Sequence, residues 1–588
     1  MIDKLDFPAD GPYFPVSRYP PTKMQRFSGA TFLTLLLGGV PCACANPALE
    51  GYAKHEAFSA QVKELDASDL VEVTSLGKSV GSRDLWLLTV GTGKTAEKPA
   101  ILIVGNVQGS HLAGGEISLR MARSLAAQGA TDEKIKKLLE DVTFYFIPRP
   151  DPDACEKCFL QPFRLRAGND RPTDDDRDFE LGEDAPDDLN GDGWITMMRV
   201  EDETGDYFSH PDDPRILIQA DPKKNERGKY RLLSEGHDND GDEEFNEDGG
   251  DGVAFNRNFT FGYRPFQAGT GANAVSEPES RAVADFLLGH PTIAAVFCFS
   301  PEDNLFHTWK PNQDLERARI RTRVLTADAA LLEHLAEEYR KLHGGNECPG
   351  SPDGVGSFSQ WGYFHTGRWS LAARGWWVSK VEPPPEPKPE EGKPEPKKPS
   401  GEKRGSDELN LLRWLAQEKL DGFVNWVVVE HPDFPGKKVE VGGFKPFYAM
   451  NPPARELDGL AEKHLKFVAQ LPDSFPKLAI IEAKADSLGG GVYRVRATVV
   501  NRGFLPTMPE MGQVNGEAYP LQISIVLPKD AEFLQGHART RFGRLEGAGG
   551  KREKTWLIRF GKEQPASVEV KVWGPAVGSA SANVPITP

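Results

Sequence analysis

The segment AILIVGNVQGSH, residues 100–111, decides the fold class of this chain. It opens with a continuous apolar run that is typical of a fully buried strand, and the run stops at Gly105-Asn106. Residues 113–128 follow, with apolar side chains at helical spacing among small residues. A buried strand followed directly by a helix is the unit from which α/β proteins with parallel sheets are built.

The same unit recurs further along the chain. Residues 142–147 and 293–299 are apolar runs of strand length, and residues 277–288 and 326–342 carry the helical apolar period. Strands that alternate with helices predict an α/β fold, in which helices flank a mixed, mostly parallel sheet on both faces.

After residue 478 the apolar period changes to two, as in residues 492–500. Strand patterns then recur between turns to the end of the sequence, without a helical pattern, and they predict a C-terminal all-β sandwich. We therefore expect three parts: an N-terminal extension with a signal peptide at 1–45, an α/β domain at 46–475 and a β-sandwich domain at 476–588.

Two segments interrupt the expected α/β domain. Residues 170–255 form an acidic insertion, rich in Gly and Asp, which is too long for an ordinary loop. Residues 382–408 form a Pro/Glu/Lys-rich tract. Because this composition cannot form a packed core, the tract is predicted to be an exposed linker.

The overall charge excludes one class of partner. The 588 residues include 70 Lys and Arg against 87 Asp and Glu, which gives a formal net charge of −17. Such an acidic chain is unsuited to binding nucleic acid or an anionic membrane surface. Apolar residues make up 39% of the chain, enough for a large core. No stretch after residue 45 is long and apolar enough to predict a transmembrane helix.

The first 45 residues predict export. A short basic segment at Met24–Arg26 precedes an apolar run at Thr31–Val40, and small residues follow up to Ala45. This is the order of a secretory signal peptide, with cleavage after Ala45 and release to the periplasm or the exterior. A lipoprotein attached through Cys42 or Cys44 is the weaker alternative, because no Leu followed by small residues leads up to either cysteine.

Two of the remaining cysteines lie close together in the sequence. Cys155 and Cys158 form a C-x-x-C pair, but a zinc ribbon would require a second such pair. We expect these two residues to lie in a loop and to form a local disulfide in an oxidising compartment.

Five sequence blocks together resemble the zinc carboxypeptidase family (carboxypeptidase A-like metallopeptidases), in particular a large exported bacterial branch. The resemblance spans most of the predicted α/β domain. It implies the carboxypeptidase fold, a zinc ion, and hydrolysis that removes C-terminal residues from peptides. The blocks are residues 105–111, 148–153, 255–259, 361–367 and 370–376.

The resemblance also locates the zinc site of the family. There, a His-x-x-Glu motif after one strand and a His at the end of a later strand hold zinc, and a Glu activates the bound water. In this sequence the corresponding positions read Gln108, His111, Ser300 and Arg374. All four residues are replaced, so we predict a degenerate site that lacks both zinc and peptidase activity.

The chemistry of the replacements supports this prediction. Gln108 offers a neutral amide oxygen and Ser300 a hydroxyl, and both are weak zinc ligands beside imidazole and carboxylate. Only His111 remains a good donor. Arg374 cannot deprotonate, so it cannot act as a general base. At about 5 Å and an effective dielectric constant of about 20, its charge would repel a dication by about 6–7 kcal/mol.

The substrate-recognition residues of the family are retained. Asn256 and Arg257 match the pair that holds the terminal carboxylate of the substrate, and an Arg fork beside an amide suits a carboxylate. We therefore expect a peptide C-terminus or another small carboxylate as the ligand, with Arg374 as a second cation. The alternatives are that Arg257 pairs with a carboxylate of the fold, and that Glu116 or Glu302 neutralises Arg374.

A rebuilt metal site is a further alternative. Histidines 307 and 365 and the acidic pair Glu302-Asp303 lie near the former ligand positions in the sequence, and His111 could recruit them. An active metallocarboxypeptidase with an unusual ligand set is therefore the second hypothesis for the function. A purely structural or interaction protein is the third.

The acidic insertion contains a repeated spacing of carboxylates. Oxygen ligands at positions 1, 3 and 5, with a carboxylate further on, are what a calcium loop supplies. The last Glu falls two positions earlier than in an EF-hand, so these stretches predict calcium loops of another type, with a solvated acidic loop as the alternative. The candidate ligands are Asp174, Asp176, Asp178 and Glu183; Asp188, Asn190 and Asp192; and Asp238, Asp240, Asp242 and Glu247.

Overall fold

The computed structural model describes residues 46–175, 177–246, 248–344, 348–382, 404–562 and 564–587. The predicted signal peptide, the candidate calcium ligands Asp176 and Glu247, and most of the Pro/Glu/Lys-rich tract lie outside the described residues. All of the described residues belong to one compact unit.

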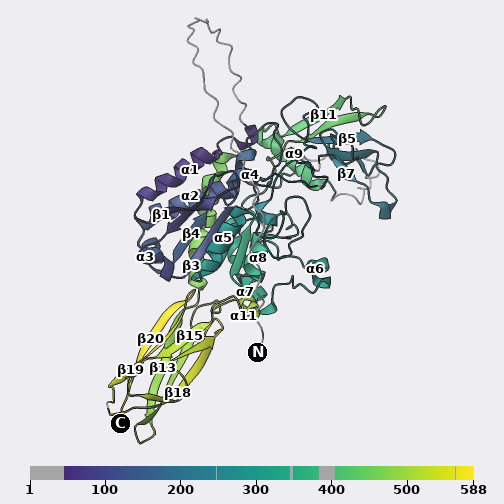
Figure 1. The fold of residues 1–588 in the computed structure, drawn as a ribbon. Helices are drawn as coiled ribbons and strands as arrows, with labels where there is room; N and C mark the ends of the chain where they lie inside the picture. Colours follow the sequence, from purple (N-terminus) through teal and green to yellow (C-terminus); the bar gives the residue numbers. More distant parts are fainter. Residues whose placement is uncertain are drawn as a thin grey trace, which may run out of the picture. The chain divides into compact units, whose positions relative to one another are not determined.

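A six-stranded mixed sheet forms the centre of the α/β part (Figure 1). Its order is β1-β2-β4-β3-β9-β10; the three pairings from β4 to β10 are parallel and the two that involve β2 are antiparallel. The predicted mixed, mostly parallel sheet is thus confirmed. The strands are β1 (Val71–Lys78), β2 (Asp84–Val90), β3 (Ala100–Asn106), β4 (Thr143–Ile147), β9 (Ile293–Phe299) and β10 (Trp369–Ala373).

Helices cover this sheet. Strands β3, β4, β9 and β10 are buried at every residue, which explains why their sequences are continuous apolar runs. Helix α2 packs on β2, β3 and β4, α5 packs on β1, and α8 packs on β9 and β10. The helices of this part are α1 (His55–Glu64), α2 (Ala113–Gly129), α3 (Glu133–Asp141), α5 (Pro278–Gly289), α6 (Gln313–Arg317), α7 (Thr326–His343), α8 (Phe358–Phe364), α9 (Ser406–Glu418) and α10 (Leu457–Gln470).

A close backbone approach fixes the turn from β3 to α2. A Cβ atom at Gly105 would lie 2.1 Å from the carbonyl oxygen of Pro148, and one at Gly115 would lie 2.9 Å from the same oxygen. Neither distance leaves room for a side chain, so glycine is required at both positions. The turn between them, residues 107–112, is thereby held at the carboxyl end of β3.

The predicted disulfide between Cys155 and Cys158 is wrong. Both residues are buried free thiols, and Cys155 lies on the short helix α4 (Pro152–Lys157) rather than in a loop. The thiol of Cys155 donates to Asn106 Oδ1 at 3.3 Å, and that of Cys158 donates to the carbonyl oxygen of Ala154 at 3.3 Å. The helix starts here because Asp151 caps it and Pro152 occupies its first turn.

A second six-stranded sheet, antiparallel throughout, was not expected from the sequence. The acidic insertion supplies four of its strands, and residues after the Pro/Glu/Lys-rich tract supply the other two, so segments far apart in the sequence lie side by side (Figure 1). In sheet order the strands are β11 (Phe423–Val429), β12 (Val439–Phe444), β5 (Met197–Glu201), β8 (Tyr230–Ser234), β6 (Tyr207–Ser209) and β7 (Leu217–Gln219).

The end of the predicted linker also belongs to this region. Residues 404–408 of the tract are described, and α9 already begins at Ser406, so the predicted linker extends too far. Arg404 forms two hydrogen bonds with the carboxylate of Glu226 in the acidic insertion, at 2.7 and 2.8 Å. This ion pair attaches the end of the tract to the second sheet.

The C-terminal part is a sandwich of two four-stranded antiparallel sheets, as predicted, around a core that includes the fully buried Trp556. The expected absence of helix is wrong: α11 (Glu510–Asn515) is present, and both carboxylate oxygens of Asp328 on α7 accept from its first backbone N–H groups. The strands are β13 (Leu478–Ser487), β14 (Val492–Asn501), β18 (Lys551–Arg559) and β16 (Glu532–Gln535), then β17 (Arg539–Gly543), β15 (Leu521–Ile525), β19 (Ser567–Gly574) and β20 (Gly578–Pro585).

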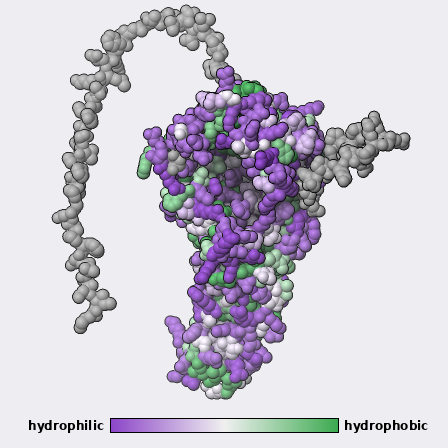
Figure 2. All heavy atoms as spheres, turned by 90° about the vertical axis from the view of Figure 1, so that its right-hand side faces the viewer, coloured by the Kyte–Doolittle hydropathy of each residue, from purple (hydrophilic) through white to green (hydrophobic). Residues whose placement is uncertain are grey.

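The surface agrees with the acidic composition. The face in Figure 2 is largely hydrophilic, and its hydrophobic patches are small and scattered. Among the described residues, none of the helices is both long and apolar enough to cross a membrane.

Candidate functional site

The four positions that the resemblance assigns to the zinc site of the family meet at one edge of the first sheet. Gln108 and His111 follow β3, Ser300 follows β9 and Arg374 follows β10. Because β3, β9 and β10 are neighbouring parallel strands, their carboxyl ends lie along the same edge. The topology therefore places these four residues in one region.

His111 and Arg374 are electrostatically coupled in this region. Burial, and then the positive charge of Arg374, lower the pKa of His111 from 6.5 to about 4. His111 is thus a neutral imidazole at neutral pH. The site at the carboxyl end of β3 therefore combines a neutral imidazole with the permanent positive charge of a guanidinium.

The guanidinium of Arg374 is bound by backbone carbonyl groups. Its Nη2 atom donates to the carbonyl oxygens of Gly350 at 3.0 Å and Pro301 at 3.3 Å. Within the described residues, Arg374 forms no salt bridge, and its Nε atom is buried without a hydrogen-bond partner. The proposed neutralisation by Glu116 is wrong, because Glu116 pairs with Arg120 and Arg149 instead.

Ser300 and Asn256 both form a hydrogen bond with the same buried carboxylate. The hydroxyl of Ser300 and the side-chain N–H of Asn256 both donate to Oε2 of Glu302, the latter at 2.7 Å. The remaining polar atom of Asn256, Oδ1, accepts from the backbone N–H of Phe358 at 3.1 Å. Asn256 therefore fastens the segment after β9 to the start of α8.

Two buried carboxyl groups lie close to Arg374. Burial raises the pKa of Glu302, while hydrogen bonds from Ser300 and Asn256 and the charge of Arg374 act in the opposite direction. Burial likewise raises the pKa of Asp303, whose Oδ2 accepts from the backbone N–H of Arg374 at 3.0 Å. The charge of Arg374 acts to lower the pKa of both acids, although neither forms a salt bridge with it among the described residues.

Arg257 lies on the surface. It ends the 3-10 helix η5 (Phe255–Arg257), is exposed, and donates from Nη1 to the carbonyl oxygen of Ala268 at 2.8 Å. The alternative that it pairs with a carboxylate of the fold is not observed, because it forms no salt bridge within the part of the chain that is described. Its guanidinium therefore remains accessible to a ligand.

The rebuilt metal site is not assembled. The Nε2 atom of His307 lies 2.8 Å from the carbonyl oxygen of Cys348, and the Nδ1 atom of His365 lies 2.7 Å from the hydroxyl of Thr260. Across the described residues, the groups of three or more potential metal ligands that converge do not include His111, His307 or His365.

One of the converging groups lies in the acidic insertion, where calcium loops are expected. Carboxylate oxygens of Asp238, Asp240 and Asp242 lie within 4.8 Å of one another. Asp238 also accepts from the backbone N–H groups of Gly241 at 2.6 Å and Asp242 at 3.1 Å, so it organises the loop. Of the first candidate set, Asp176 lies outside the described residues, so its convergence with Asp174 and Asp178 stays a prediction.

The middle candidate loop is closed by its own hydrogen bonds. Asp188 accepts from the backbone N–H groups of Asp192 at 3.1 Å and Gly193 at 2.7 Å, and Asn190 Oδ1 accepts from Asp192 at 2.9 Å. These bonds form a tight turn before Trp194. The side-chain oxygens of Asp188 and Asn190 are therefore directed to backbone N–H groups of the loop itself.

The second converging group was missed in the sequence. It consists of His237, His431 and Asp433, whose ligand atoms also lie within 4.8 Å of one another. His237 follows β8, and the other two lie between β11 and β12. No local pattern signals this group, because its members are brought together only by the second sheet.

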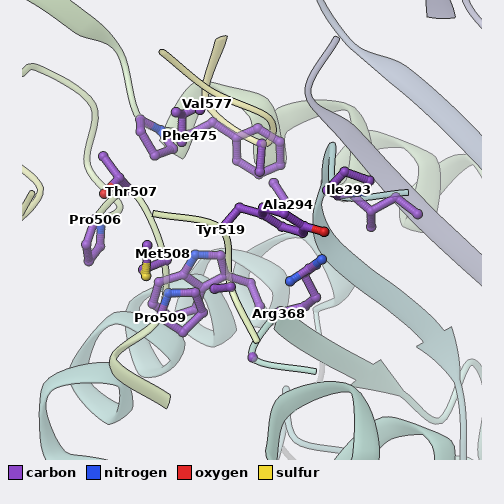
Figure 3. A pocket seen from close by; sticks show the side chains of 17 residues that line it. Ile293, Ala294, Arg368, Phe475, Pro506, Thr507, Met508, Pro509, Tyr519 and Val577 are labelled. Carbon is purple, nitrogen blue, oxygen red and sulfur yellow. The ribbon is translucent and has the colours of Figure 1, made fainter. Parts of the chain in front are cut away.

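A small cavity of about 30 Å³ lies elsewhere, between residues of the sandwich and the edge of the first sheet. Figure 3 shows the hydroxyl end of Tyr519 and the guanidinium of Arg368 directed to the same side of it. Burial lowers the pKa of Arg368, and Tyr519 partly offsets this effect. The space suits about one water molecule, so it does not hold a peptide.

Comparison with protein families assigns two regions. Residues 57–192 match the family described as "Zinc carboxypeptidase", and residues 477–585 match a "Domain of unknown function (DUF8731)". The chain thus contains a region of zinc carboxypeptidase type. This region includes Gln108 and His111, whereas Asn256, Ser300 and Arg374 lie beyond it.

Individual relatives match a similar region. A "Zinc carboxypeptidase" of Saccharothrix mutabilis subsp. capreolus is 30% identical over 113 residues, which is 18% of this chain and 26% of the relative. Mouse "Carboxypeptidase M" is 30% identical over 104 residues, which is 17% of this chain and 23% of the relative. The chain therefore matches about a quarter of the length of these curated relatives.

Among solved structures, carboxypeptidase A from Helicoverpa armigera is similar with a TM-score of 0.32 and 14% identity, over 54% of this chain and 61% of that one. A metallo-carboxypeptidase from Burkholderia cenocepacia is also similar, with a TM-score of 0.30 and 15% identity, over 55% of this chain and 60% of that one.

Proposed function

We propose that this protein is an exported carboxypeptidase-like protein that binds carboxylate ligands, such as peptide C-termini, and does not hydrolyse them with zinc. The observation that carries the proposal is the position of Arg374, next to His111 at the carboxyl end of the sheet, with its guanidinium bound by carbonyl groups. Its positive charge disfavours a dication and favours an anion at the same place.

The residues at the four positions do not fit a zinc ion. The hydroxyl of Ser300 already donates a hydrogen bond to Glu302, and Gln108 offers only a neutral amide oxygen as a ligand. His111 alone offers an imidazole, and three protein ligands are usual even in an open catalytic zinc site. We therefore derive no zinc-dependent step for this region.

Carboxylate binding rests on arginine rather than on Asn256. Both polar atoms of the buried Asn256 side chain already form hydrogen bonds within the fold, which leaves at most one N–H for a ligand. Arg257 is exposed, and Arg374 is bound through Nη2 to two carbonyl oxygens and also contacts the thiol of Cys348, with no salt bridge among the described residues. Each charge-assisted hydrogen bond to a carboxylate would contribute about 1.5–3 kcal/mol.

Calorimetric titration tests the proposal with a pair of peptides that differ only in a free or an amidated C-terminus. The free form should bind more tightly, and both Arg257→Ala and Arg374→Met should remove that preference. Arg321→Ala, an exposed arginine in the same part of the chain, is the matched control and should leave it unchanged. Equal binding of the two peptides by the unaltered protein would contradict the proposal and favour a purely structural or interaction protein.

We also propose that the acidic insertion binds calcium. The convergence of Asp238, Asp240 and Asp242 supports this, because oxygen ligands at alternate positions of a tight loop suit a calcium ion. Calcium would then stabilise the fold of the insertion rather than take part in chemistry.

A further inference from the structure

The cluster of His237, His431 and Asp433 lies at one end of the second sheet. His237 follows β8 by three residues, and His431 and Asp433 lie in the connection between β11 and β12. The side chain of His431 is completely buried, while those of His237 and Asp433 are 34% and 29% exposed. The cluster therefore combines a fixed centre with an opening to solvent.

The hydrogen bonds of His431 define which ring nitrogen carries the proton. Its Nε2 atom lies 2.9 Å from the carbonyl oxygen of Gly236, a contact that requires a proton on Nε2. Its Nδ1 atom accepts a 3.3 Å hydrogen bond from the backbone N–H of Asp433. The Nδ1 lone pair of the neutral ring thus points to the backbone N–H of Asp433, and a metal ion bound at Nδ1 would replace this long hydrogen bond while Nε2 stays held by the carbonyl group, as in other metal-binding histidines.

His237 presents a second nitrogen to the same carboxylate. Its Nδ1 atom is buried without a hydrogen-bond partner among the described residues, and it lies 3.9 Å from Oδ2 of Asp433. The Nδ1 atom of His431 lies 3.5 Å from that oxygen. Both distances are too long for hydrogen bonds, so the three side chains converge without a hydrogen bond between them.

Neighbouring contacts hold the three groups in place. The backbone N–H of Asp238 donates to Oδ2 of Asp433 at 3.2 Å, and the rings of His237 and His431 have centroids 4.8 Å apart. Phe434 packs against His431 with ring centroids 5.1 Å apart. The group is therefore positioned by the fold and not by the mutual attraction of its members.

We propose that Nδ1 of His237, Nδ1 of His431 and Oδ2 of Asp433 bind a divalent transition-metal ion of the zinc class, with a fourth position open to solvent. Two imidazoles and a carboxylate with an open position form a familiar zinc ligand set. Tetrahedral ligands at zinc–nitrogen distances lie about 3.3 Å apart, and the observed separations of 3.5 and 3.9 Å need only a small inward movement.

The ligand types distinguish this site from the acidic loop beside it. Asp238, Asp240 and Asp242 offer only carboxylate oxygens, which suit calcium, whereas imidazole nitrogen favours zinc, copper or nickel. A bound ion would join the acidic insertion to the connection between β11 and β12, which belong to different stretches of sequence separated by the Pro/Glu/Lys-rich tract. The ion would thus link two parts of the second sheet while its fourth position stays open to water.

Metal titration of the full chain tests this site. The protein is stripped with a chelator and titrated with Zn²⁺ by calorimetry, and with Co²⁺ to record the visible absorption of a tetrahedral complex. We expect one zinc ion per chain. His237→Ala and Asp433→Asn should each weaken its binding by about 100-fold or more and abolish the tetrahedral cobalt spectrum, because loss of a residue that only hydrogen-bonds to a metal ligand already costs about 10- to 100-fold.

Three control variants separate this site from others. His537→Ala removes an exposed histidine of the sandwich, Asp240→Asn alters the acidic loop, and His111→Ala alters the end of β3. All three should bind Zn²⁺ as the unaltered protein does. Because His237 and Asp433 are partly exposed, their variants should keep the circular dichroism of the folded chain. Absence of zinc binding, unchanged binding in both cluster variants, or loss of binding in a control would overturn the proposal.

Discussion

The side-chain amide of Asn256 donates a 2.7 Å hydrogen bond to the buried carboxylate of Glu302. The resemblance to carboxypeptidases had placed Asn256 beside the carboxylate of a substrate, but in this protein its partner is a carboxylate of the chain itself. Glu302 in turn accepts from Ser300, which the resemblance places at a zinc-ligand position. A buried acid and its two donors thus replace part of the expected metal and substrate site.

Restoring the four residues of the family should restore zinc binding at this edge of the sheet. The variant combines Gln108→His, His111→Glu, Ser300→His and Arg374→Glu, which returns three ligands and removes the repulsive guanidinium. It is measured in the His237→Ala background, so that the cluster on the second sheet does not contribute. Elemental analysis should then find zinc bound at one equivalent per chain. A folded variant without zinc would mean that Glu302 and its neighbours have closed the pocket.

The protonation of His111 should depend on Arg374. NMR titration should give His111 a pKa of about 4. In Arg374→Met the pKa should rise, yet stay below 6.5, because burial is the larger cause of the shift. An unchanged pKa in this variant would contradict the electrostatic contact between the two residues.

The same shift predicts a pH dependence of stability. The folded-state pKa lies below the unfolded value of 6.5, so the unfolded chain binds the proton first. The contribution of His111 to stability should be present above pH 6.5 and be lost as the pH falls toward 4. His111→Gln should reduce the slope of the unfolding free energy in this window, and an unchanged slope would argue against it.

Calcium should stabilise the acidic insertion. At 100 times its dissociation constant, a ligand that binds only the folded state adds about 2.7 kcal/mol. We expect calcium to raise the melting temperature and to slow proteolysis within residues 170–255. The double variant Asp240→Asn, Asp242→Asn should lose both effects, while Asp238 is kept because it organises the loop. Asp69→Asn, an exposed aspartate outside the insertion, is the control. A calcium response that survives the double variant would place the ion elsewhere.

The sequence predicts the first sheet well for a simple physical reason. Strands β3, β4 and β9 are buried on both faces, so their residues must be apolar throughout, and the pattern is visible without neighbours. The second sheet gives no comparable signal. Strands β6 and β7 have three residues each and lie among charged turns, and β5 pairs with β12 from a segment more than two hundred residues away.

The candidate site was predictable in position but not in its contacts. Parallel strand order places Ser300 and Arg374 at one edge, and the replaced residue types can be read from the sequence. The hydrogen bond from Asn256 to Glu302 depends on side-chain geometry, and the spacing of the two residues in the sequence does not predict it. The proximity of His237 and His431 was not predicted for a related reason, because it depends on the second sheet, which the sequence pattern does not indicate.

The most direct test of the central claim is a peptidase assay with the protein saturated with zinc. Peptides with free C-termini are incubated with it, and mass spectrometry follows the loss of C-terminal residues. We predict no release above that seen without protein, since the resemblance places Arg374, which cannot deprotonate, at the general-base position and we propose that the residues beside it do not hold zinc. Chelator-sensitive release of C-terminal residues that His111→Ala abolishes and His237→Ala does not would contradict it.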